Sequence, residues 1–441
     1  MGFQLRDYQA RCVEKTMAAM RLDGNDLIAL PTGAGKSIIV AEIASRMNEP
    51  MLIFQPSREI LEQNRSKLQK YVSVYDIGTY SASMSEKTIR KFTFATIGSV
   101  YKRPDMFAHI GLILIDEAHL VNSKNDDSMF MTFLNEVNRI RATENLPKIK
   151  IIGLTATPWR NVLGYHSVNG NLMRQVTCKL MTRTNSGPKG KQPPFWKRLI
   201  FNIHNADLVV DGYLSPLMYD DCSFITQDDI PVNASRSDFN LKVFVDKLEV
   251  RLDVVLARIA QAEKECKSIL VFCSSVAQAR DMARLVPGSS WVSGETPTKE
   301  RTGIIEAFKH GGIQTVFNVG VLTTGFDHPE LDCIVMLRPT KSLSLYYQMA
   351  GRGVRIADGK TFCTLVDFSS NVANMGAIET IKLVKEPEEG KQFPMWQLKT
   401  STGNWHNRPL YEYQIKEKKP RRGDLGRQWL MQMEAKERSN W

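Results

Sequence analysis

The chain has 441 residues, of which 43% are hydrophobic and 24% charged, and its formal net charge is +11. This length exceeds what one hydrophobic core organises and predicts two or three domains, while the composition excludes a disordered or fibrous protein. No apolar run approaches the roughly 18 residues of a membrane span. The seven cysteines include no C-x-x-C pair, which argues against a disulfide framework and a zinc ribbon. We therefore expect a cytoplasmic protein without a membrane partner.

Short apolar runs alternate with amphipathic stretches along most of the chain, which is the pattern of a parallel sheet covered by helices on both faces. Strands are expected at residues 26–30, 51–54, 92–95, 112–115 and 149–154, and after a gap at 268–272, 290–292, 315–318, 333–337 and 362–366. Leu52–Ser57 and Leu270–Ser275 resemble each other, since each is an apolar strand that ends in small hydroxyl residues. The sequence therefore predicts an α/β fold with two copies of one unit.

Two segments carry the excess positive charge. Residues 159–206 contain eight basic side chains and no acidic one, and residues 380–441 contain 13 basic and eight acidic ones. Such segments favour a polyanion as partner, because each neutralised phosphate releases counterions. The alternative is a solvated face that keeps the protein soluble. Residues 185–194, rich in Gly, Pro and Lys, are expected to form an exposed loop.

Aromatic residues in these two segments are open to two interpretations. Phe195 and Trp196 either stack on exposed bases or anchor the loop on its own lobe. In the C-terminal region we expect Trp396 and Trp405 to anchor a small core, and we expect a helix from Gly426 to Arg438.

A glycine-rich turn, Leu30–Ser37, follows the first expected strand and precedes a helical run. The backbone N–H groups of such a turn close around phosphate oxygens, and the helix N-terminus adds partial positive charge. Lys36 is expected to reach the β- and γ-phosphates and Ser37 to bind Mg²⁺. Leu30 stands where the general P-loop pattern has its first glycine, so the strict pattern is not met.

The expected strand 112–115 delivers Asp116-Glu117-Ala118-His119 at its C-terminal end. That end is where α/β sheets bind ligands. Asp116 is the expected second Mg²⁺ partner, and Glu117 could orient and deprotonate the attacking water. A polar strand-to-helix turn is the alternative, and a phosphate-binding loop 80 residues earlier in the chain makes it improbable.

With these motifs the sequence resembles superfamily 2 helicases of the DEAH-box type, from about Leu5 to Phe368. The motifs of that family occur in order: Leu5–Gln9 (adenine reading), Leu30–Ser37 (I), Gln55–Glu59 (Ia), Thr96–Ser99 (Ib), Asp116–His119 (II), Thr155–Pro158 (III), Val271–Ser274 (IV), Leu322–Asp327 (V) and Gln348–Arg355 (VI). Motif I has the P-T-G-x-G-K-S form of this superfamily, which explains the missing glycine.

The resemblance implies an α/β protein of two tandem RecA-like parallel-sheet lobes, with a basic inter-lobe insertion and a small C-terminal appendage. Lobe 1 is expected at residues 1–215, with the insertion at about 159–206. Lobe 2 is expected at 216–372 and a basic, aromatic appendage at 373–441.

Within the superfamily the chain is similar to RadD-type repair helicases and to phage branch-migration helicases, including that of bacteriophage T5. Val321–Asp327, Leu337–Thr340 and Ser344–Tyr346 carry this likeness. No cysteine follows Cys363, so the zinc segment common in RadD-type proteins is not expected. A bacterial cell or a phage-infected host is the expected setting.

The resemblance also implies a role for individual residues. The catalytic set is Lys36, Asp116, Glu117, Gln348, Arg352 and Arg355, with Ser37 and Asp116 as metal ligands. The ATP-binding set is Arg6, Gln9, Thr32, Gly33, Gly35, Lys36, Ser37, Gly325 and Asp327. The nucleic-acid set is Pro56, Ser57, Arg58, Gly98, Ser99, Ser274, Thr323 and Thr324, and the residues expected to couple the two sites are His119, Thr155 and Thr157.

These roles imply an ATP- and Mg²⁺-dependent DNA helicase or translocase that acts on forked or branched DNA in recombination, repair or replication. The expected partners are single-stranded, forked or branched DNA and a single-stranded-DNA-binding protein, and the expected state is a monomer. The alternatives are an RNA helicase of the same architecture and a duplex-DNA translocase that does not separate strands. A binding adaptor with a degenerate ATPase is disfavoured, because every catalytic position is intact.

Overall fold

The structure is a computed structural model that describes residues 4–168, 171–187, 191–235, 237–323, 325–388, 391, 393–405 and 408–414. Thr324 and the expected helix Gly426–Arg438 lie outside the described residues. The chain divides into two compact units. The first comprises Met1–Val162 and Cys178–Arg408, and the second comprises Leu163–Thr177 and Pro409–Trp441.

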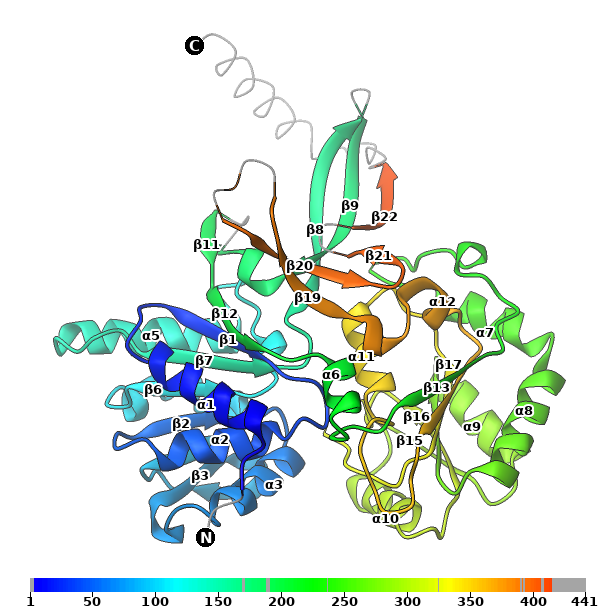
Figure 1. Ribbon diagram of the computed structural model, residues 1–441, viewed down its shortest axis with the longest axis horizontal. Coiled ribbons are helices and arrows are strands. Elements are labelled where there is room, and N and C mark those ends of the chain that lie inside the picture. The colour runs from blue at the N-terminus through cyan, green and yellow to red at the C-terminus, as the bar shows by residue number, and fades with distance from the viewer. Residues whose placement is uncertain are drawn as a thin grey trace, which may run out of the picture. The chain divides into compact units, whose positions relative to one another are not determined.

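The first sheet of the larger unit has eight strands in the order β12-β1-β7-β6-β2-β5-β3-β4 (Figure 1). Its strands are β1 (Asn25–Ala29), β2 (Met51–Phe54), β3 (Ile77–Ser81), β4 (Glu86–Lys87), β5 (Phe92–Ala95), β6 (Leu112–Ile115), β7 (Lys150–Thr155) and β12 (Trp196–Asn202). All neighbours are parallel except β3 and β4. Its helices are α1 (Asp7–Ala19), α2 (Lys36–Ser45), α3 (Arg58–Leu68), α4 (Ile97–Val100) and α5 (Met129–Thr143). We call this part lobe 1.

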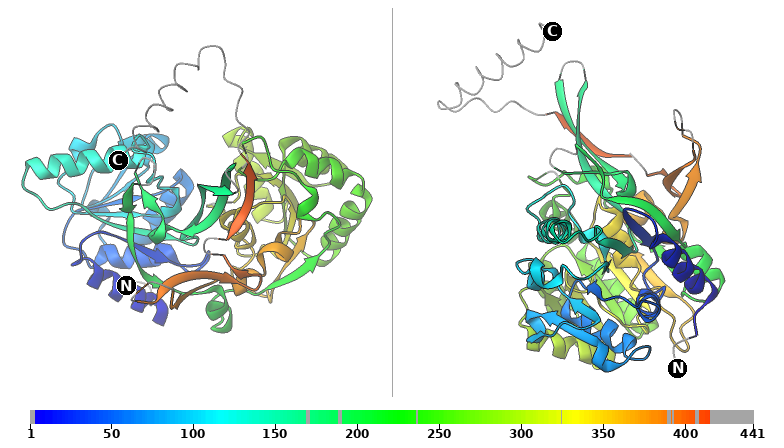
Figure 2. Two further views of the ribbon diagram at one scale, coloured as in Figure 1. Left: turned by 90° about the horizontal axis from the view of Figure 1, so that it is seen from above. Right: turned by 90° about the vertical axis from the view of Figure 1, so that its left-hand side faces the viewer.

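The second sheet has six parallel strands in the order β13-β18-β17-β14-β16-β15. They are β13 (Leu217–Asp221), β14 (Ile269–Cys273), β15 (Ser290–Ser293), β16 (Thr315–Val319), β17 (Cys333–Leu337) and β18 (Cys363–Asp367). The accompanying helices are α6 (Asn205–Val210), α7 (Leu241–Glu249), α8 (Leu252–Glu265), α9 (Val276–Leu285), α10 (Thr298–Lys309), α11 (Leu343–Ala350) and α12 (Asn371–Met375). We call this part lobe 2; Figure 2 shows both lobes from two further sides.

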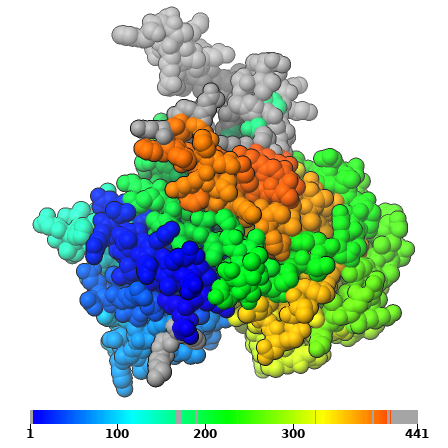
Figure 3. Space-filling view, viewed as in Figure 1, coloured from blue at the N-terminus to red at the C-terminus, as the bar shows by residue number. Residues whose placement is uncertain are grey.

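The two lobes confirm the α/β fold with tandem parallel sheets. Each of the ten expected strands corresponds to an observed strand whose ends differ by at most one residue. The central strands β2, β5, β6, β14 and β17 are buried along their whole length, which explains their continuous apolar runs. Figure 3 shows that the surfaces of the two lobes meet along one face of the larger unit.

One strand of lobe 1 lies inside the segment expected as a basic insertion. β12 pairs in parallel with β1, from Asn25↔Trp196 to Ala29↔Asn202. Trp196 is 1% exposed and belongs to the core of lobe 1, and the ring of Phe195 lies edge-on to it with 4.9 Å between centroids. Trp196 is therefore an anchor, and the interpretation that it stacks on bases is wrong. The strand was missed because Lys197 and Arg198 interrupt its apolar pattern.

The remaining described strands are antiparallel. β19 (Lys382–Glu386), β20 (Met395–Thr400) and β21 (Gly403–Asn404) form one sheet, beside which Trp405 is 3% exposed, as expected of a core anchor. β10 (Asn185–Ser186) and β11 (Gln192–Pro194) pair across the ends of the expected loop. β8 (Trp159–Val168), β9 (Asn171–Leu180) and β22 (Pro409–Gln414) form a third small sheet. Within the described part of the chain, no helix has the length and apolar character to cross a membrane.

Candidate active site between the two lobes

The turn between β1 and α2 has the backbone geometry of a phosphate cradle. Gly33 and Gly35 adopt φ angles of +83° and +74°, which disfavour any side chain. A Cβ atom at Gly33 would lie 2.9 Å from Leu214 Cδ2 and one at Gly35 would lie 2.6 Å from Gln9 Nε2, so both positions require glycine. α2 begins directly after this turn, at Lys36, and places a helix N-terminus beside it.

A pocket of about 260 Å³ lies in front of this turn, and residues of both lobes line it. Lobe 1 contributes Arg6, Thr32, Gly33, Gly35, Lys36, Ser37, Asp116 and Glu117, and lobe 2 contributes Gly325, Asp327, Arg352 and Arg355. All twelve were predicted from the sequence as nucleotide-site residues. The fold thus brings most of that set together in one place.

Two predicted residues do not line this pocket. Gln9 is 2% exposed; its Oε1 accepts from the Arg6 N–H at 3.0 Å and its Nε2 donates to the Ala34 carbonyl at 3.4 Å. Gln9 therefore supports the phosphate turn through its hydrogen bond to Ala34 and does not face the pocket. Gln348 is 9% exposed and lines a different pocket, in lobe 2.

The two carboxylates of the pocket have opposite pKa shifts. Burial, followed by the charge of Glu117, raises the pKa of Asp116 to about 6. Burial also raises the pKa of Glu117, but the charge of Lys36 and the hydrogen bond from His119 outweigh it, and the net pKa is lowered to about 2. Glu117 has a φ of 51°, a left-handed conformation that is uncommon for a residue with a side chain. At neutral pH Glu117 is therefore ionised and can accept hydrogen bonds from water.

The two arginines of lobe 2 are held differently. Arg352 is 4% exposed; its Nη1 donates to the Phe326 carbonyl at 2.7 Å, and burial, followed by the charge of Arg355, lowers its pKa to about 9. Arg355 Nε lies 3.0 Å from Asp327 Oδ1, while its Nη1 is buried without a hydrogen-bond partner among the described residues. An anionic group in the pocket would give this donor a partner.

A chain of hydrogen bonds connects the lobes behind the carboxylates. Gln348 Nε2 and His119 Nε2 are 3.2 Å apart, and His119 Nδ1 lies 3.1 Å from Thr155 Oγ1. Since an amide nitrogen can only donate, Nε2 of the neutral imidazole accepts and its Nδ1 carries the proton. The Thr157 N–H donates to Thr155 Oγ1 at 3.0 Å. The three residues predicted to couple the sites therefore form one connected network with Gln348.

Seven of the residues that line the pocket were not predicted from the sequence, and four of these have polar or aromatic side chains that contact predicted residues. Gln63 Nε2 donates to Asp327 Oδ2 at 2.6 Å, Asn64 Nδ2 to Asp116 Oδ2 at 3.3 Å and Lys67 Nζ to Ser37 Oγ at 3.3 Å. The ring of Tyr213 lies under the Arg6 guanidinium, 4.2 Å from centroid to Cζ. Gln63 and Lys67 are four residues apart on α3, so a helix beginning at the motif Ia residues would have placed both on one face.

Of the residues predicted to contact nucleic acid, Thr324 lies outside the described residues and the other seven do not line the nucleotide pocket. Pro56 and Gly98 line an apolar pocket of about 350 Å³ in lobe 1, and Thr323 lines a pocket of lobe 2. The other four make local contacts: Ser57 accepts from the Ile60 N–H, Arg58 pairs with Glu62, Ser99 accepts from the Ala82 N–H and Ser274 donates to the Leu337 carbonyl.

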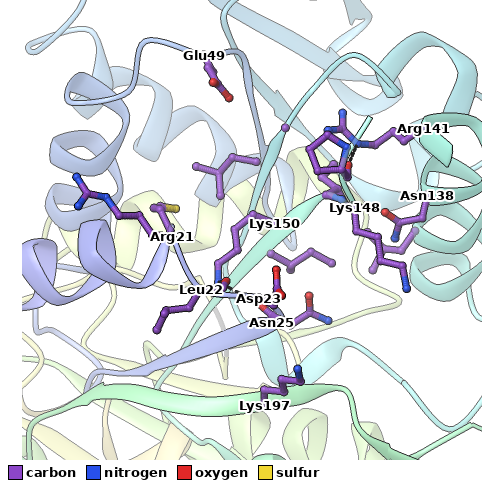
Figure 4. Close-up of a pocket in the computed structure, with 18 of the residues that line it drawn as sticks. Arg21, Leu22, Asp23, Asn25, Glu49, Asn138, Arg141, Lys148, Lys150 and Lys197 are labelled. Atoms are coloured by element: carbon purple, nitrogen blue, oxygen red, sulfur yellow. Dashed lines mark hydrogen bonds between the residues drawn. The ribbon is translucent and has the colours of Figure 1, made fainter. Parts of the chain in front are cut away.

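A larger cavity of about 980 Å³ lies at the N-terminal ends of β1, β6 and β7 in the lobe 1 sheet (Figure 4). Two of the six basic side chains that line it, Arg141 and Lys150, donate to groups of the protein itself. Arg141 donates to the carbonyls of Ala108, Ile110 and Pro147. Lys150 donates to those of Leu22 and Gly24 and pairs with Asp26 at 2.7 Å. These contacts hold the base of the sheet together and leave no cation of the pair free for a ligand.

Two protein families match the chain in tandem. The family described as "Type III restriction enzyme, res subunit" matches residues 2–160, and the family described as "Helicase conserved C-terminal domain" matches residues 247–357. The fold is that of two tandem RecA-like lobes. The two matches fall on lobe 1 and on lobe 2 in turn, and the chain is similar to superfamily 2 helicases in both.

Individual relatives agree with this class. IRC3 of Saccharomyces cerevisiae is 26% identical over 387 residues, which cover 82% of this chain and 51% of the relative. The DNA 3'-5' translocase XPB2 of Sulfurisphaera tokodaii is 23% identical over 377 residues, 80% of this chain and 79% of the relative. The chain spans about half to two thirds of the length of several curated relatives. The structure of the Type ISP restriction-modification enzyme LlaBIII bound to DNA shares the fold, with a TM-score of 0.56 at 15% identity over 84% of this chain and 28% of that one.

Proposed function

We propose that the chain is an ATP-dependent DNA helicase or translocase. The observation that carries this proposal is the composite pocket, in which the phosphate turn and the carboxylates of lobe 1 face Arg352 and Arg355 of lobe 2. Transfer of a phosphoryl group to water requires positive charge around the γ-phosphate. Because two of the cations are arginines of lobe 2, this charge is complete only when lobe 2 is close to lobe 1.

The residues present fit a nucleotide and its metal. The backbone of the glycine turn, the N-terminus of α2 and Arg355 Nη1 offer donors for phosphate oxygens, and this Nη1 has no hydrogen-bond partner in the part of the chain that the structure describes. The Ser37 hydroxyl and the Asp116 carboxylate would hold Mg²⁺, which supplies charge neutralisation at the phosphates. Arg6 stacks directly on the Tyr213 ring, 4.2 Å from Cζ to the centroid, and this pair forms the side of the pocket against which a base could stack.

In this proposal Glu117 orients the attacking water and accepts its proton. The low pKa of Glu117 makes it a weak base, so its task is mainly to position the water. Lys36 and Arg352 stabilise charge on the transferring group from opposite lobes. Because Gln348 connects to His119 and Thr155, a change in the nucleotide pocket can alter a side chain that lines a lobe 2 pocket together with Thr323.

DNA is the proposed substrate, since XPB2 of Sulfurisphaera tokodaii, which is similar over most of its length, is named a DNA translocase. The likeness of the motif V and VI residues to RadD-type and phage branch-migration helicases favours forked or branched DNA over plain duplex. In the same proposal a single-stranded-DNA-binding protein is a further partner and the active form is a monomer.

The test is ATP turnover by the wild type and Lys36→Ala, titrated with single-stranded DNA, duplex DNA, a four-way junction and matched RNA. We expect DNA to stimulate the wild type, most strongly as the junction, and Lys36→Ala to be inactive with every ligand. Stimulation by RNA alone would assign an RNA helicase instead. Equal stimulation by duplex and junction would favour a duplex translocase, and no turnover with any ligand would contradict the proposal.

A further inference from the structure

The cavity of about 980 Å³ in lobe 1, which we call the base cavity, has a lining that is both basic and apolar. It lies where β1, β6 and β7 begin, whereas the nucleotide pocket lies where β1 and β6 end, and the two share no lining residue. Six basic and two acidic side chains line the base cavity. Two of the basic ones are neutralised, because Arg46 pairs with Glu42 at 2.7 Å and Lys150 with Asp26 at 2.7 Å. The other four are Arg21, Arg141, Lys148 and Lys197.

Three of these four cations are available to a ligand. Arg21, Lys148 and Lys197 are exposed, and none of them forms an ion pair with a described residue. The acidic side chains of the lining, Asp23 and Glu49, therefore neutralise none of the three. In the view of Figure 4, Arg21 lies to the left of the cavity, Lys148 to the right and Lys197 below it. The three charges thus face the cavity from different sides.

Arg141 adds a buried charge to this lining. It is 4% exposed, and the groups that accept from it are three neutral backbone carbonyls. Burial lowers the pKa of Arg141, opposed by the charges of Glu144 and Glu49. Because no carboxylate in the described part of the chain pairs with Arg141, its charge makes the base cavity more favourable for an anionic ligand.

Apolar side chains line the cavity between these cations. Leu22 is 49% exposed, and Met20, Met47 and Phe195 are half-buried in the same lining. A ligand that carried only phosphates would leave this apolar surface unused, so the lining matches a ligand that carries apolar groups beside its negative charges. The exposed amide of Asn135, which also lines the cavity, can both donate to and accept from a peptide backbone.

We propose that the base cavity is a docking site for an acidic peptide segment of a partner protein. The carboxylates of the segment would lie among Arg21, Lys148 and Lys197, and one of its apolar side chains would pack on Leu22 and Phe195. This inference goes beyond the proposed function and does not depend on it. A peptide docked in the base cavity leaves the nucleotide pocket accessible, since no residue lines both.

The test measures the fluorescence anisotropy of a fluorescein-labelled peptide, Asp-Asp-Leu-Asp-Asp-Leu, titrated with the full chain. One comparison peptide has asparagine in place of each aspartate, and another has serine in place of each leucine. We expect saturable binding of the acidic apolar peptide, and binding weaker by about tenfold or more for either comparison peptide. Labelled single-stranded DNA is titrated in parallel, because a nucleic acid is the other anionic partner.

Two variants of the lining separate its charge from its apolar surface. The double variant Lys148→Glu/Lys197→Glu reverses two charges and should weaken binding of the peptide about tenfold or more. Leu22→Ser should weaken it about fivefold, because the exposed half of the leucine side chain is the part that the peptide would cover. Neither variant should change DNA-stimulated ATP turnover, since none of these residues lines the nucleotide pocket.

Lys242→Glu/Arg284→Glu is the matched control and should bind the peptide as the wild type does. It also reverses two exposed cations, of which Lys242 is on α7 and Arg284, with its side chain 71% exposed, is on α9 of lobe 2. The unfolding temperature of each variant checks that it is folded. The proposal is wrong if the wild type does not bind the peptide or if folded Lys148→Glu/Lys197→Glu binds it equally well. It is also wrong if that variant loses affinity only for DNA. In each case DNA-stimulated ATP turnover by the wild type leaves the proposed function standing.

Discussion

At the scale of single residues, one unpartnered buried group lies where a ligand is expected. Arg355 Nη1 lines the nucleotide pocket and lacks a hydrogen-bond partner among the described residues. Folded proteins rarely leave buried donors unsatisfied. Arg141 shows the contrasting case, since its guanidinium donates to three backbone carbonyls and serves the fold.

His328 predicts a pH dependence of stability at the same scale. It is 3% exposed, its Nε2 lies 2.7 Å from Ser268 Oγ, and burial lowers its pKa, opposed by the charge of Glu330. A histidine with a lowered folded pKa contributes stability above its unfolded pKa of about 6.5, and this is lost as the pH falls through the folded pKa. The loss cannot exceed about 1.4 kcal/mol per pH unit for one proton.

Urea unfolding at pH 7.5 and 5.5 measures this effect. We expect His328→Gln to remove part of the loss of stability that the wild type shows at pH 5.5. His310→Gln is the control, because that histidine is on α10 with its side chain 77% exposed, and it should behave as the wild type. Equal pH dependence in the wild type and His328→Gln would contradict the assignment.

At the scale of elements, α3 connects the two lobes. Ser57 caps its N-terminus by accepting from the Ile60 N–H, and the helix then presents Gln63, Asn64 and Lys67 to the nucleotide pocket. Gln63 reaches Asp327 of lobe 2 at 2.6 Å. α3, which begins among motif Ia residues, thus contributes a contact between the two lobes. The motif Ia residues themselves are expected to contact the nucleic-acid strand.

Replacing Gln63 with Ala should weaken closure on the nucleotide. The contact is one hydrogen bond to a charged group, so we expect the KM for ATP to rise about tenfold, with a smaller effect on kcat. Steady-state ATP turnover with saturating DNA measures both constants. Gln69→Ala, an exposed position at the C-terminal end of the same helix, is the control. An unchanged KM for ATP in Gln63→Ala would show that the contact between Gln63 and Asp327 does not stabilise the nucleotide-bound arrangement of the lobes.

β12 gives a prediction about stability. Trp196 is buried in the core of lobe 1 and packs so closely on β7 that a Cβ atom at Gly153 would lie 2.5 Å from its Cη2. Trp196→Ala should therefore cost about 3–5 kcal/mol in the free energy of unfolding. Trp291→Ala, at a half-buried position of the edge strand β15, should cost less. A stable Trp196→Ala with weakened DNA binding would instead revive the base-stacking interpretation.

At the scale of the whole molecule, the sequence predicted the two tandem α/β units and the parallel strands that are buried on both faces of their sheets. Ten of the fourteen strands of these two sheets were predicted, because continuous apolar runs such as Leu112–Ile115 are typical of strands buried on both faces. β3, β4, β12 and β13 were missed, and charged side chains interrupt the two outer strands β12 and β13, as at Lys197 and Asp220.

The site was predictable to the extent that it lies in short motifs. Residues adjacent in sequence to a strand end, such as Lys36 and Asp116, were placed correctly in one pocket. Tyr213 was not found, because its part depends on a contact with Arg6, far away in the chain, and the partner of Gln63 could not be predicted for the same reason. Gln63 and Asp327 are 264 residues apart in the chain, and no local sequence pattern predicts that two such residues are in contact.

The central claim is that the catalytic site is complete only when lobe 2 supplies its arginines to lobe 1. The most direct measurement is DNA-stimulated ATP turnover by Arg352→Ala, together with the affinity of that variant for a fluorescent ATP analogue. The account predicts a loss of turnover of about a thousandfold or more with nucleotide binding retained, while Arg284→Ala behaves as the wild type. An unchanged kcat in Arg352→Ala would contradict it.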